Sequence, residues 1–418
     1  MNAREQFLKT LNHQQPGRIV LDLGSTGVTG IHIKALSKLR RHFGLQRKPL
    51  RVIDPFQMLG DVDWELIDPV GIDVVGVCCR KNIFGFPNQA PFREWKTPWR
   101  QRVMVPMGFN VTTDENGDIL IYPEGDSAFP PSAKMSAAGF AFEPVIRQES
   151  ASKGEMNPED NVEEFGLLDE KELEHWRTAC SKAHASGKAV IATVSGTSLG
   201  NPMLIPGMKL RRPKGIRDIN LWYKYIVSKP AFIKKIFDRQ SEIAIENLNR
   251  ISAVSGNKID AIFLCGTDFG SPDFAYSPEQ FEEIWLPYYK RMNDWIHENT
   301  QWKTFKHSYG TTEGFPEQFI KAGFDIINPV QGEESGLNPK DLKKKYGLSV
   351  VFWGGGVDAR KTLQFGTPEQ VRDEVLRNSE DYIKNGGFVF SASHNTSATT
   401  PVENIVAMLK AVREFNGN

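Results

Sequence analysis

Residues 259–307 read IDAIFLCGTDFGSPDFAYSPEQFEEIWLPYYKRMNDWIHENTQWKTFKH, and this stretch contains the repeating unit that decides the fold. An apolar, β-branched run at 259–265 is followed by residues 277–298, whose apolar side chains recur at intervals of three and four. A second short apolar run follows at 303–307. This spacing is typical of an amphipathic helix between two strands. It predicts a strand–helix–strand unit of a parallel sheet.

The same alternation continues on both sides of this unit. Further runs that suit buried parallel strands lie at 18–23, 72–78, 189–195, 324–329, 349–353 and 388–391. Helical segments at 368–384 and 401–415 each begin with proline after threonine, a common start of a helix. Eight strands separated by helices predict an α/β protein with a TIM (β/α)8 barrel. An open doubly wound sheet is the alternative, although no GxGxxG motif stands between a strand and a helix.

Two segments depart from this alternation. The N-terminal 18 residues predict an amphipathic helix ahead of the barrel, with Phe7 and Leu11 four residues apart. Residues 80–165 interrupt the barrel, and TDENGD at 113–118 within them predicts the turn of a β-hairpin. We expect a single domain, residues 1–418, in which 80–165 form an inserted excursion that caps the site.

The amino-acid composition argues against several kinds of binding partner and structural site. The chain has 51 basic and 51 acidic residues, so its charge offers no attraction for nucleic acid or an anionic membrane. Its four cysteines contain no CxxC pair, which argues against a disulfide framework or a structural zinc knot. The N-terminus lacks the apolar core of a signal peptide, and no stretch is long enough to span a bilayer. We expect a cytoplasmic protein that acts on a small molecule, with its oligomeric state open.

Polar residues at the C-terminal ends of the predicted strands are the candidates for chemistry, because active sites of TIM barrels lie there. His307, His394 and Asp268 are the predicted catalytic residues, since imidazole titrates near neutral pH and a nearby carboxylate can support it. His307 and His394 are also candidate ligands for a divalent metal. The predicted substrate-binding residues are Asp22, Ser195, Tyr309, Gln331 and Asp358. The alternative is that each of these side chains only hydrogen-bonds the loops that close the barrel.

Four stretches resemble the uroporphyrinogen decarboxylase superfamily. They are AREQFLKTLNHQQPGRIVLDLG at 3–24, KHSYG at 306–310, WGGGVDARKTLQFGTPEQVRDEVLRNSEDY at 353–382 and GGFVFSASHNTSATTPVENIVAMLKAVREF at 386–415. The resemblance extends over essentially the whole chain. It implies a TIM barrel with its active site in the cleft at the C-terminal ends of the strands.

The early part of the chain differs from the haem-pathway decarboxylases of this superfamily. Those enzymes carry an arginine-rich RQAGR-type motif, where this sequence reads LDLGSTGVTG at 21–30. A substrate with many carboxylates requires bidentate cationic partners, which this stretch does not contain. The chain is therefore more similar to the corrinoid-linked methyltransferases of the superfamily.

In thiol-dependent members of that branch, a His-x-Cys pair and a further residue hold zinc. His307 matches the histidine, whereas Tyr309 and His394 stand at the other two positions. The resemblance implies a methyltransferase for a small methylated substrate, with zinc at the site and methylcobalamin carried by a corrinoid partner protein. The alternatives are a decarboxylase of uroporphyrinogen or another cyclic acid, with Asp22 or Asp268 as the acid, and a non-catalytic binding protein.

Overall fold

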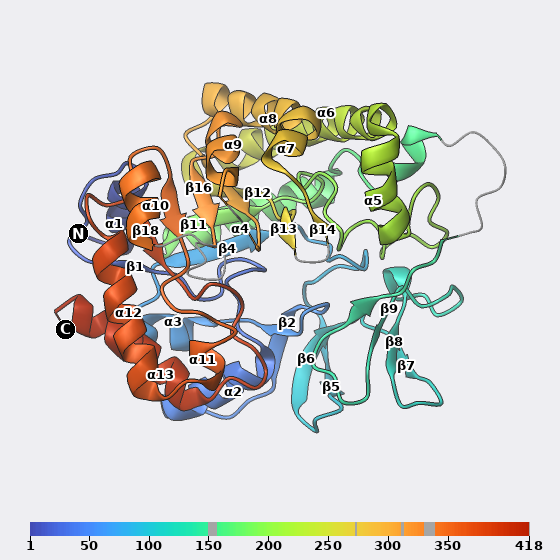
Figure 1. Ribbon diagram of the computed structural model, residues 1–418. Helices are drawn as coiled ribbons and strands as arrows, with labels where there is room; N and C mark the ends of the chain where they lie inside the picture. Colours follow the sequence, from blue (N-terminus) through green and yellow to red (C-terminus); the bar gives the residue numbers. More distant parts are fainter. Residues whose placement is uncertain (149–156, 272–273, 311–312, 330–338, 418) are drawn as a thin grey trace.

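The computed structural model describes residues 1–148, 157–271, 274–310, 313–329 and 339–417 (Figure 1). Its centre is an eight-stranded sheet in which every recorded strand pair is parallel. In order across the sheet the strands are β1 (Val20–Leu21), β18 (Phe388–Phe390), β17 (Val351–Trp353), β16 (Ile326–Asn328), β15 (Lys303–His307), β12 (Ala261–Cys265), β11 (Ala189–Thr193) and β4 (Val74–Cys78). Each lies within one of the eight predicted runs, so the predicted TIM barrel is confirmed.

Asp73 joins the two edge strands, β1 and β4. Its backbone N–H donates to the carbonyl of Leu21 at 2.9 Å, and its carboxylate accepts from the Leu21 N–H at 2.9 Å. Arg18 forms an ion pair with the same carboxylate at 2.5 Å. Because β1 is only two residues long, this side chain supplies a hydrogen bond that a longer strand would take from the backbone.

The N-terminal end of the barrel is closed by α1 (Ala3–Leu11), the predicted helical extension. Phe7 and Leu11 are buried and belong to the cluster that fills the barrel, and the Phe7 ring lies 5.6 Å from that of Trp353. The strand residues of this cluster are Val20, Val74, Ala189, Ile191, Ala261, Phe305, Ile326, Val351, Trp353 and Val389. With this interior packed, the C-terminal ends of the strands form the mouth of the barrel.

Helices surround the sheet. The predicted helix over 277–298 is divided at Trp285 into α7 (Pro278–Ile284) and α8 (Leu286–Asn299). Pro287 explains the break, because proline lacks the N–H that a continuous helix would use there. The other helices are α2 (Ile33–His42), α3 (Trp64–Val70), α4 (Glu170–Ala185), α5 (Ile219–Ser228), α6 (Pro230–Ser255), α9 (Phe315–Lys321), α10 (Pro339–Tyr346), α11 (Thr362–Phe365), α12 (Pro368–Tyr382) and α13 (Val402–Phe415).

Two four-stranded sheets stand beside the barrel, at the lower right of Figure 1. One has the order β3-β2-β6-β5 and the other β10-β9-β8-β7. The strands are β2 (Leu50–Asp54), β3 (Leu59–Gly60), β5 (Phe92–Lys96), β6 (Arg102–Pro106), β7 (Val111–Thr113), β8 (Ile119–Ile121), β9 (Ala133–Met135) and β10 (Glu143–Pro144). The predicted hairpin joins β7 and β8. Since β2 and β3 precede residue 80, the β structure outside the barrel begins earlier than the predicted insertion.

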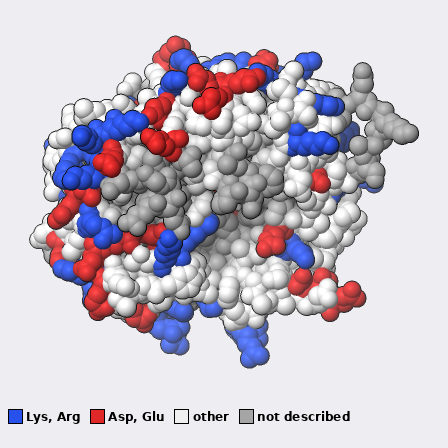
Figure 2. Space-filling model, viewed as in Figure 1, with Lys and Arg blue, Asp and Glu red and all other residues white. Residues whose placement is uncertain are grey.

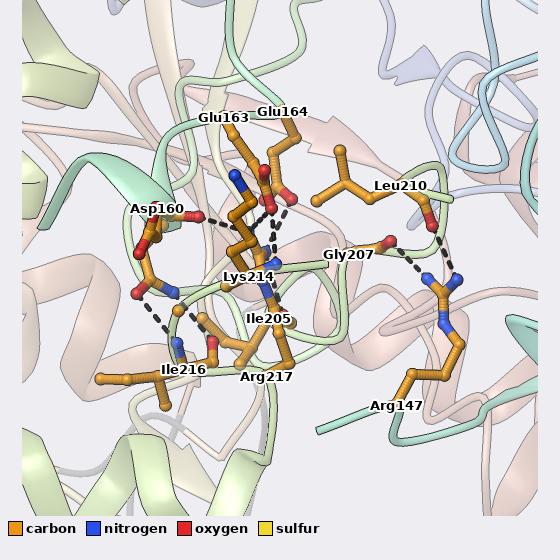
Figure 3. Close-up of polar contacts among 12 residues, drawn as sticks. Arg147, Asp160, Glu163, Glu164, Ile205, Gly207, Leu210, Lys214, Ile216 and Arg217 are labelled. Atoms are coloured by element: carbon orange, nitrogen blue, oxygen red, sulfur yellow. Dashed lines mark hydrogen bonds and ion pairs between the residues drawn. The ribbon is translucent and has the colours of Figure 1, made fainter. Parts of the chain in front are cut away.

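A buried arginine ties the segment after these sheets to the loop that follows β11 (Figure 3). The Arg217 guanidinium, 1% exposed, contacts Glu164 at 2.8 Å and Glu163 at 3.1 Å. Beside it, Arg147 donates to the backbone carbonyl of Gly207 at 2.7 Å. These bonds compensate the burial of the two arginines and hold the loop in one conformation.

The surface agrees with the balanced composition. Figure 2 shows basic and acidic side chains interspersed around the rim of the face in view. Within the described ranges, no helix has both the length and the apolar character that crossing a bilayer requires.

Gly76 on β4 makes room for the loop that follows β1. A Cβ atom at this position would lie 1.9 Å from the carbonyl oxygen of Ser25, a backbone atom that cannot rotate away. We expect Gly76→Ala to lower the free energy of unfolding by about 1–3 kcal/mol, because the loop and strand must separate. Denaturant unfolding measures this change. Gly166→Ala is the matched control, since its Cβ meets no atom within 4 Å, and an equal loss in both variants would contradict the explanation.

Candidate active site

Strand alternation directs His307 and Asn328 into the mouth. Phe305 and Ile326 belong to the cluster inside the barrel, and side chains two residues apart on a strand point the same way. His307 and Asn328 are therefore the next inward positions of β15 and β16, and they are 3% and 1% exposed.

A chain of side-chain hydrogen bonds crosses the floor of the mouth. The Nδ1 atom of His307 lies 2.6 Å from Oδ1 of Asn328, and Nδ2 of Asn328 donates to the carbonyl of Trp353 at 2.7 Å. The indole Nε1 of Trp353 then donates to Oδ2 of Asp22 at 3.0 Å. The ends of four strands are thus connected by two side-chain pairs and the backbone carbonyl of Trp353, and His307 is linked to Asp22.

This series of hydrogen bonds determines the tautomer of His307. Because the amide nitrogen of Asn328 donates to a carbonyl, its Oδ1 is the acceptor and His307 Nδ1 must carry the proton. The other ring nitrogen, Nε2, then has a free lone pair. Burial lowers the pKa of His307 to about 3, so the imidazole is neutral at physiological pH.

Asp268 is the nearest acidic neighbour of that lone pair. Its Oδ1 lies 3.6 Å from His307 Nε2 and accepts the backbone N–H of Tyr309 at 2.7 Å. Desolvation in the mouth raises the pKa of Asp268, although 41% of its side chain is exposed and the Lys306 ammonium acts in the opposite direction. No hydrogen bond joins these two atoms at this distance, and the repulsion of their facing lone pairs favours the protonated form of the carboxyl.

His394 and Tyr309 complete this group of side chains. The ring of His394 lies 5.8 Å from that of His307 and 6.1 Å from that of Tyr309. Burial, followed by the charges of His307 and Arg360, lowers the pKa of His394 to about 3. The structure therefore brings the three predicted catalytic residues together with Tyr309, whereas their roles in a reaction remain predictions.

Asp22 lies under the surface of the mouth. It is 1% exposed and accepts hydrogen bonds from Trp353 and from the backbone N–H of Ser25 at 3.2 Å. Burial raises the pKa of Asp22 to about 6. The prediction that Asp22 contacts a substrate is not supported by this position, because loop and indole atoms cover the carboxyl.

The other predicted substrate-binding residues have different surroundings. Ser195 is exposed, and its backbone N–H donates to the Cys79 sulfur at 3.3 Å. The Oδ1 atom of Asp358 accepts the backbone N–H of Arg360 at 2.8 Å, so Asp358 shapes the turn that presents Arg360. Gln331 lies outside the described residues, and its predicted role stays untested.

Lys306 supports the site from behind the barrel wall. It is fully buried, and its Nζ donates to the carbonyls of Thr267, at 2.8 Å, and of His307. The rings of Phe269 and Phe319 lie 4.8 and 4.9 Å from the same nitrogen. These contacts join the ends of β12 and β15, from which Asp268 and His307 project, and compensate the buried charge.

Sequence reasoning counted Asn328 among the polar residues at the strand ends without giving it a role, and it did not assign Trp353, Lys306 or Arg360 to the site. Asn328 carried the same signal as His307, since it also ends a predicted strand. Lys306 and Trp353 lie within apolar runs and read as strand residues. Arg360 follows a turn, and nothing in the local sequence shows that its guanidinium lies 4.0 Å from the ring of Tyr309.

The expected zinc site was tested against the donor set. Among the described residues, no group of three or more His, Cys, Asp or Glu side chains is arranged to hold a metal ion. His307, His394 and Asp268 are thus not arranged as a three-ligand zinc site in this part of the chain, and the predicted zinc stays a prediction.

A cavity of about 550 Å³ lies at the opposite end of the barrel. Its lining includes the Arg18–Asp73 ion pair that joins the edge strands, together with Lys188 and Arg413. None of the side chains around His307 takes part in it, so this cavity is separate from the mouth.

The tautomer of His307 can be tested by ¹⁵N NMR of histidine-labelled protein. In the native chain we expect Nδ1 to be protonated and the ring to stay neutral above about pH 4. Asn328→Asp places a carboxylate against Nδ1–H and should raise the pKa of His307 by about 1–3 units. His32 is the internal reference. Burial lowers its pKa to about 4, and this value should be the same in both proteins. A proton on Nε2 of His307 in the native chain would contradict the assignment.

Known proteins resemble this chain at the level of family and fold. Residues 155–415 match the family model described as uroporphyrinogen decarboxylase (URO-D). Uroporphyrinogen decarboxylase of Pseudoalteromonas translucida is 24% identical over 195 residues, 46% of this chain and 51% of its own. That of Methylobacillus flagellatus is 27% identical over 150 residues, 35% of this chain and 40% of its own. The chain thus spans about half the length, or less, of these curated relatives.

Among solved structures, a methyltransferase from Methanosarcina mazei has a TM-score of 0.56 over 99% of both chains at 14% identity. At this identity the likeness shows a shared fold. The family match covers more than half of the chain and includes both histidines of the mouth. The chain belongs to the uroporphyrinogen decarboxylase (URO-D) family, whose members are enzymes.

Proposed function

We propose that this chain is a methyltransferase that removes a methyl group from a small substrate in a corrinoid-linked system. The observation that carries the proposal is the small number of cations at the mouth. Lys306 and Arg360 are the cations that act on Asp268, and Lys306 is fully buried. The arginine-free loop after β1 adds none. A porphyrinogen with many carboxylates would lack partners here, so a small substrate is favoured.

Asp268 and His307 suit the proton transfer that demethylation requires. When a methyl group leaves oxygen or nitrogen, the C–O or C–N bond breaks and the heteroatom takes a proton. Burial raises the pKa of Asp268, so its carboxyl binds a proton more tightly than an exposed aspartate does. The free lone pair of His307 Nε2 lies 3.6 Å from Oδ1 of Asp268, and its proximity favours the protonated form of this carboxyl. A corrinoid on a partner protein would supply the nucleophile that receives the methyl group.

Decarboxylation of a smaller carboxylic acid is the second candidate. The same carboxyl, with its raised pKa, could protonate the carbanion that loss of carbon dioxide leaves behind. Arg360 on the other side of Tyr309 favours an acid as substrate. This reaction would release carbon dioxide without any methyl acceptor, which separates it from the first candidate.

The proposal is tested by incubating the protein with cob(I)alamin and a panel of O- and N-methylated small molecules. We expect formation of methylcobalamin, followed by visible absorption, and no decarboxylation of uroporphyrinogen. Asp268→Asn and His307→Gln should each lower kcat by about 10²–10⁴. Asp294→Asn, on the exposed face of α8, is the control and should leave kcat unchanged.

The pH profile provides a second check. An acid must be protonated to act, so the rate should fall as pH rises through the pKa of Asp268, and this limb should vanish in Asp268→Asn. Turnover of uroporphyrinogen, or release of carbon dioxide without methylcobalamin, would overturn methyl transfer. Unchanged turnover in both site variants would place the chemistry elsewhere.

A further inference from the structure

Among the described residues, no side chain pairs with Arg360 at the rim of the mouth. Its side chain is exposed, and among the described residues no hydrogen bond or ion pair to its guanidinium is recorded. Its contact is with Tyr309, whose ring centre lies 4.0 Å from the guanidinium carbon. The surface arginines of this chain commonly meet carboxylates, as Arg239 meets Glu242 at 3.1 Å. The guanidinium of Arg360 is therefore available to a ligand.

The backbone holds Arg360 in this place. Asp358 accepts the N–H groups of Arg360, at 2.8 Å, and of Lys361, at 3.0 Å. Before this turn, Gly354 has φ +83°, and a Cβ there would lie 2.7 Å from the Asn328 amide nitrogen. The turn thus rises directly from the hydrogen-bonded floor of the mouth. The arginine it carries is fixed relative to the catalytic candidates.

Arg360 faces the same space as these candidates. Its charge adds to the lowering of the pKa values of His307 and His394 and opposes the raised pKa of Asp268. Contacts run from Arg360 to Tyr309, then to His394 at 6.1 Å between rings, and then to His307 at 5.8 Å. A ligand that binds the guanidinium would extend from there toward Asp268.

We infer that the substrate of this mouth carries a carboxylate group, which Arg360 binds. This inference rests on the proposed function, because it names the class of the methylated substrate. A planar carboxylate matches the guanidinium fork through two parallel hydrogen bonds. One exposed cation beside the Asp268 carboxyl favours a single negative charge over a phosphate dianion, which would need a second cation. The methyl-bearing atom then lies at the other end of the ligand, near Asp268 and His307.

Isothermal titration with benzoate, benzamide and phenyl phosphate tests this assignment at constant ionic strength. We expect benzoate to bind most tightly, because benzamide lacks the charge and phenyl phosphate carries a second one. Arg360→Met should weaken benzoate binding by about tenfold or more. The affinity of Arg360→Lys for benzoate should lie between those of the native protein and Arg360→Met. Lysine keeps the charge but cannot donate two parallel hydrogen bonds to a carboxylate. Arg239→Met on α6 is the control and should bind benzoate as tightly as the native protein does.

Equal binding of benzoate and benzamide, tighter binding of phenyl phosphate, or benzoate binding that Arg360→Met leaves unchanged would each overturn the inference. Absence of benzoate binding would overturn it as well. The result is separable from the proposed function. Arg360-dependent binding without methyl transfer would retain the carboxylate site and reject the reaction. Methyl transfer that is equally fast from methylated acids and from their amides would retain the reaction and reject the carboxylate site.

Discussion

The side chain of Asn328 connects the floor of the mouth to its chemistry. Its amide nitrogen is used by the carbonyl of Trp353, so its oxygen is left for the Nδ1–H of His307. Trp353 in turn holds the carboxyl of Asp22 through its indole N–H. All four groups are buried, and a buried polar group without a partner costs free energy. Each of these four residues is therefore held by its hydrogen-bonded neighbours, and Nε2 of His307 is directed into the mouth.

Burial explains the electrostatic character of the site. Both histidines have lowered pKa values, and Asp268 has a raised one, because the neutral forms lose less on transfer from water. The mouth thus favours a neutral acid and neutral bases over an ion pair. Such a set can hold and deliver a proton, which is what the departure of a methyl group or the protonation of a carbanion requires.

Membership of the URO-D family leaves the reaction open, because one fold can hold sites with different chemistry. The loop after β1 contains no arginine or lysine and packs closely on β4, where Gly76 has no space for a side chain. Positive charge enters the mouth instead from Arg360, on the loop after β17. A change in the number and position of cations alters which anions the same barrel can hold, so the fold alone does not decide the substrate.

The sequence by itself determined the barrel and part of the mouth. Apolar runs and helical spacing are local properties, and parallel strands deliver their C-terminal residues to one end, so the convergence of His307, His394, Asp268 and Tyr309 could be predicted. Only the tertiary structure decided which of these groups are covered and which are free. Asp22 is buried because Trp353, 331 positions later, reaches its carboxyl. Arg360 is free because no described side chain pairs with it. Such pairings depend on residues far apart in the chain, and no local pattern records them.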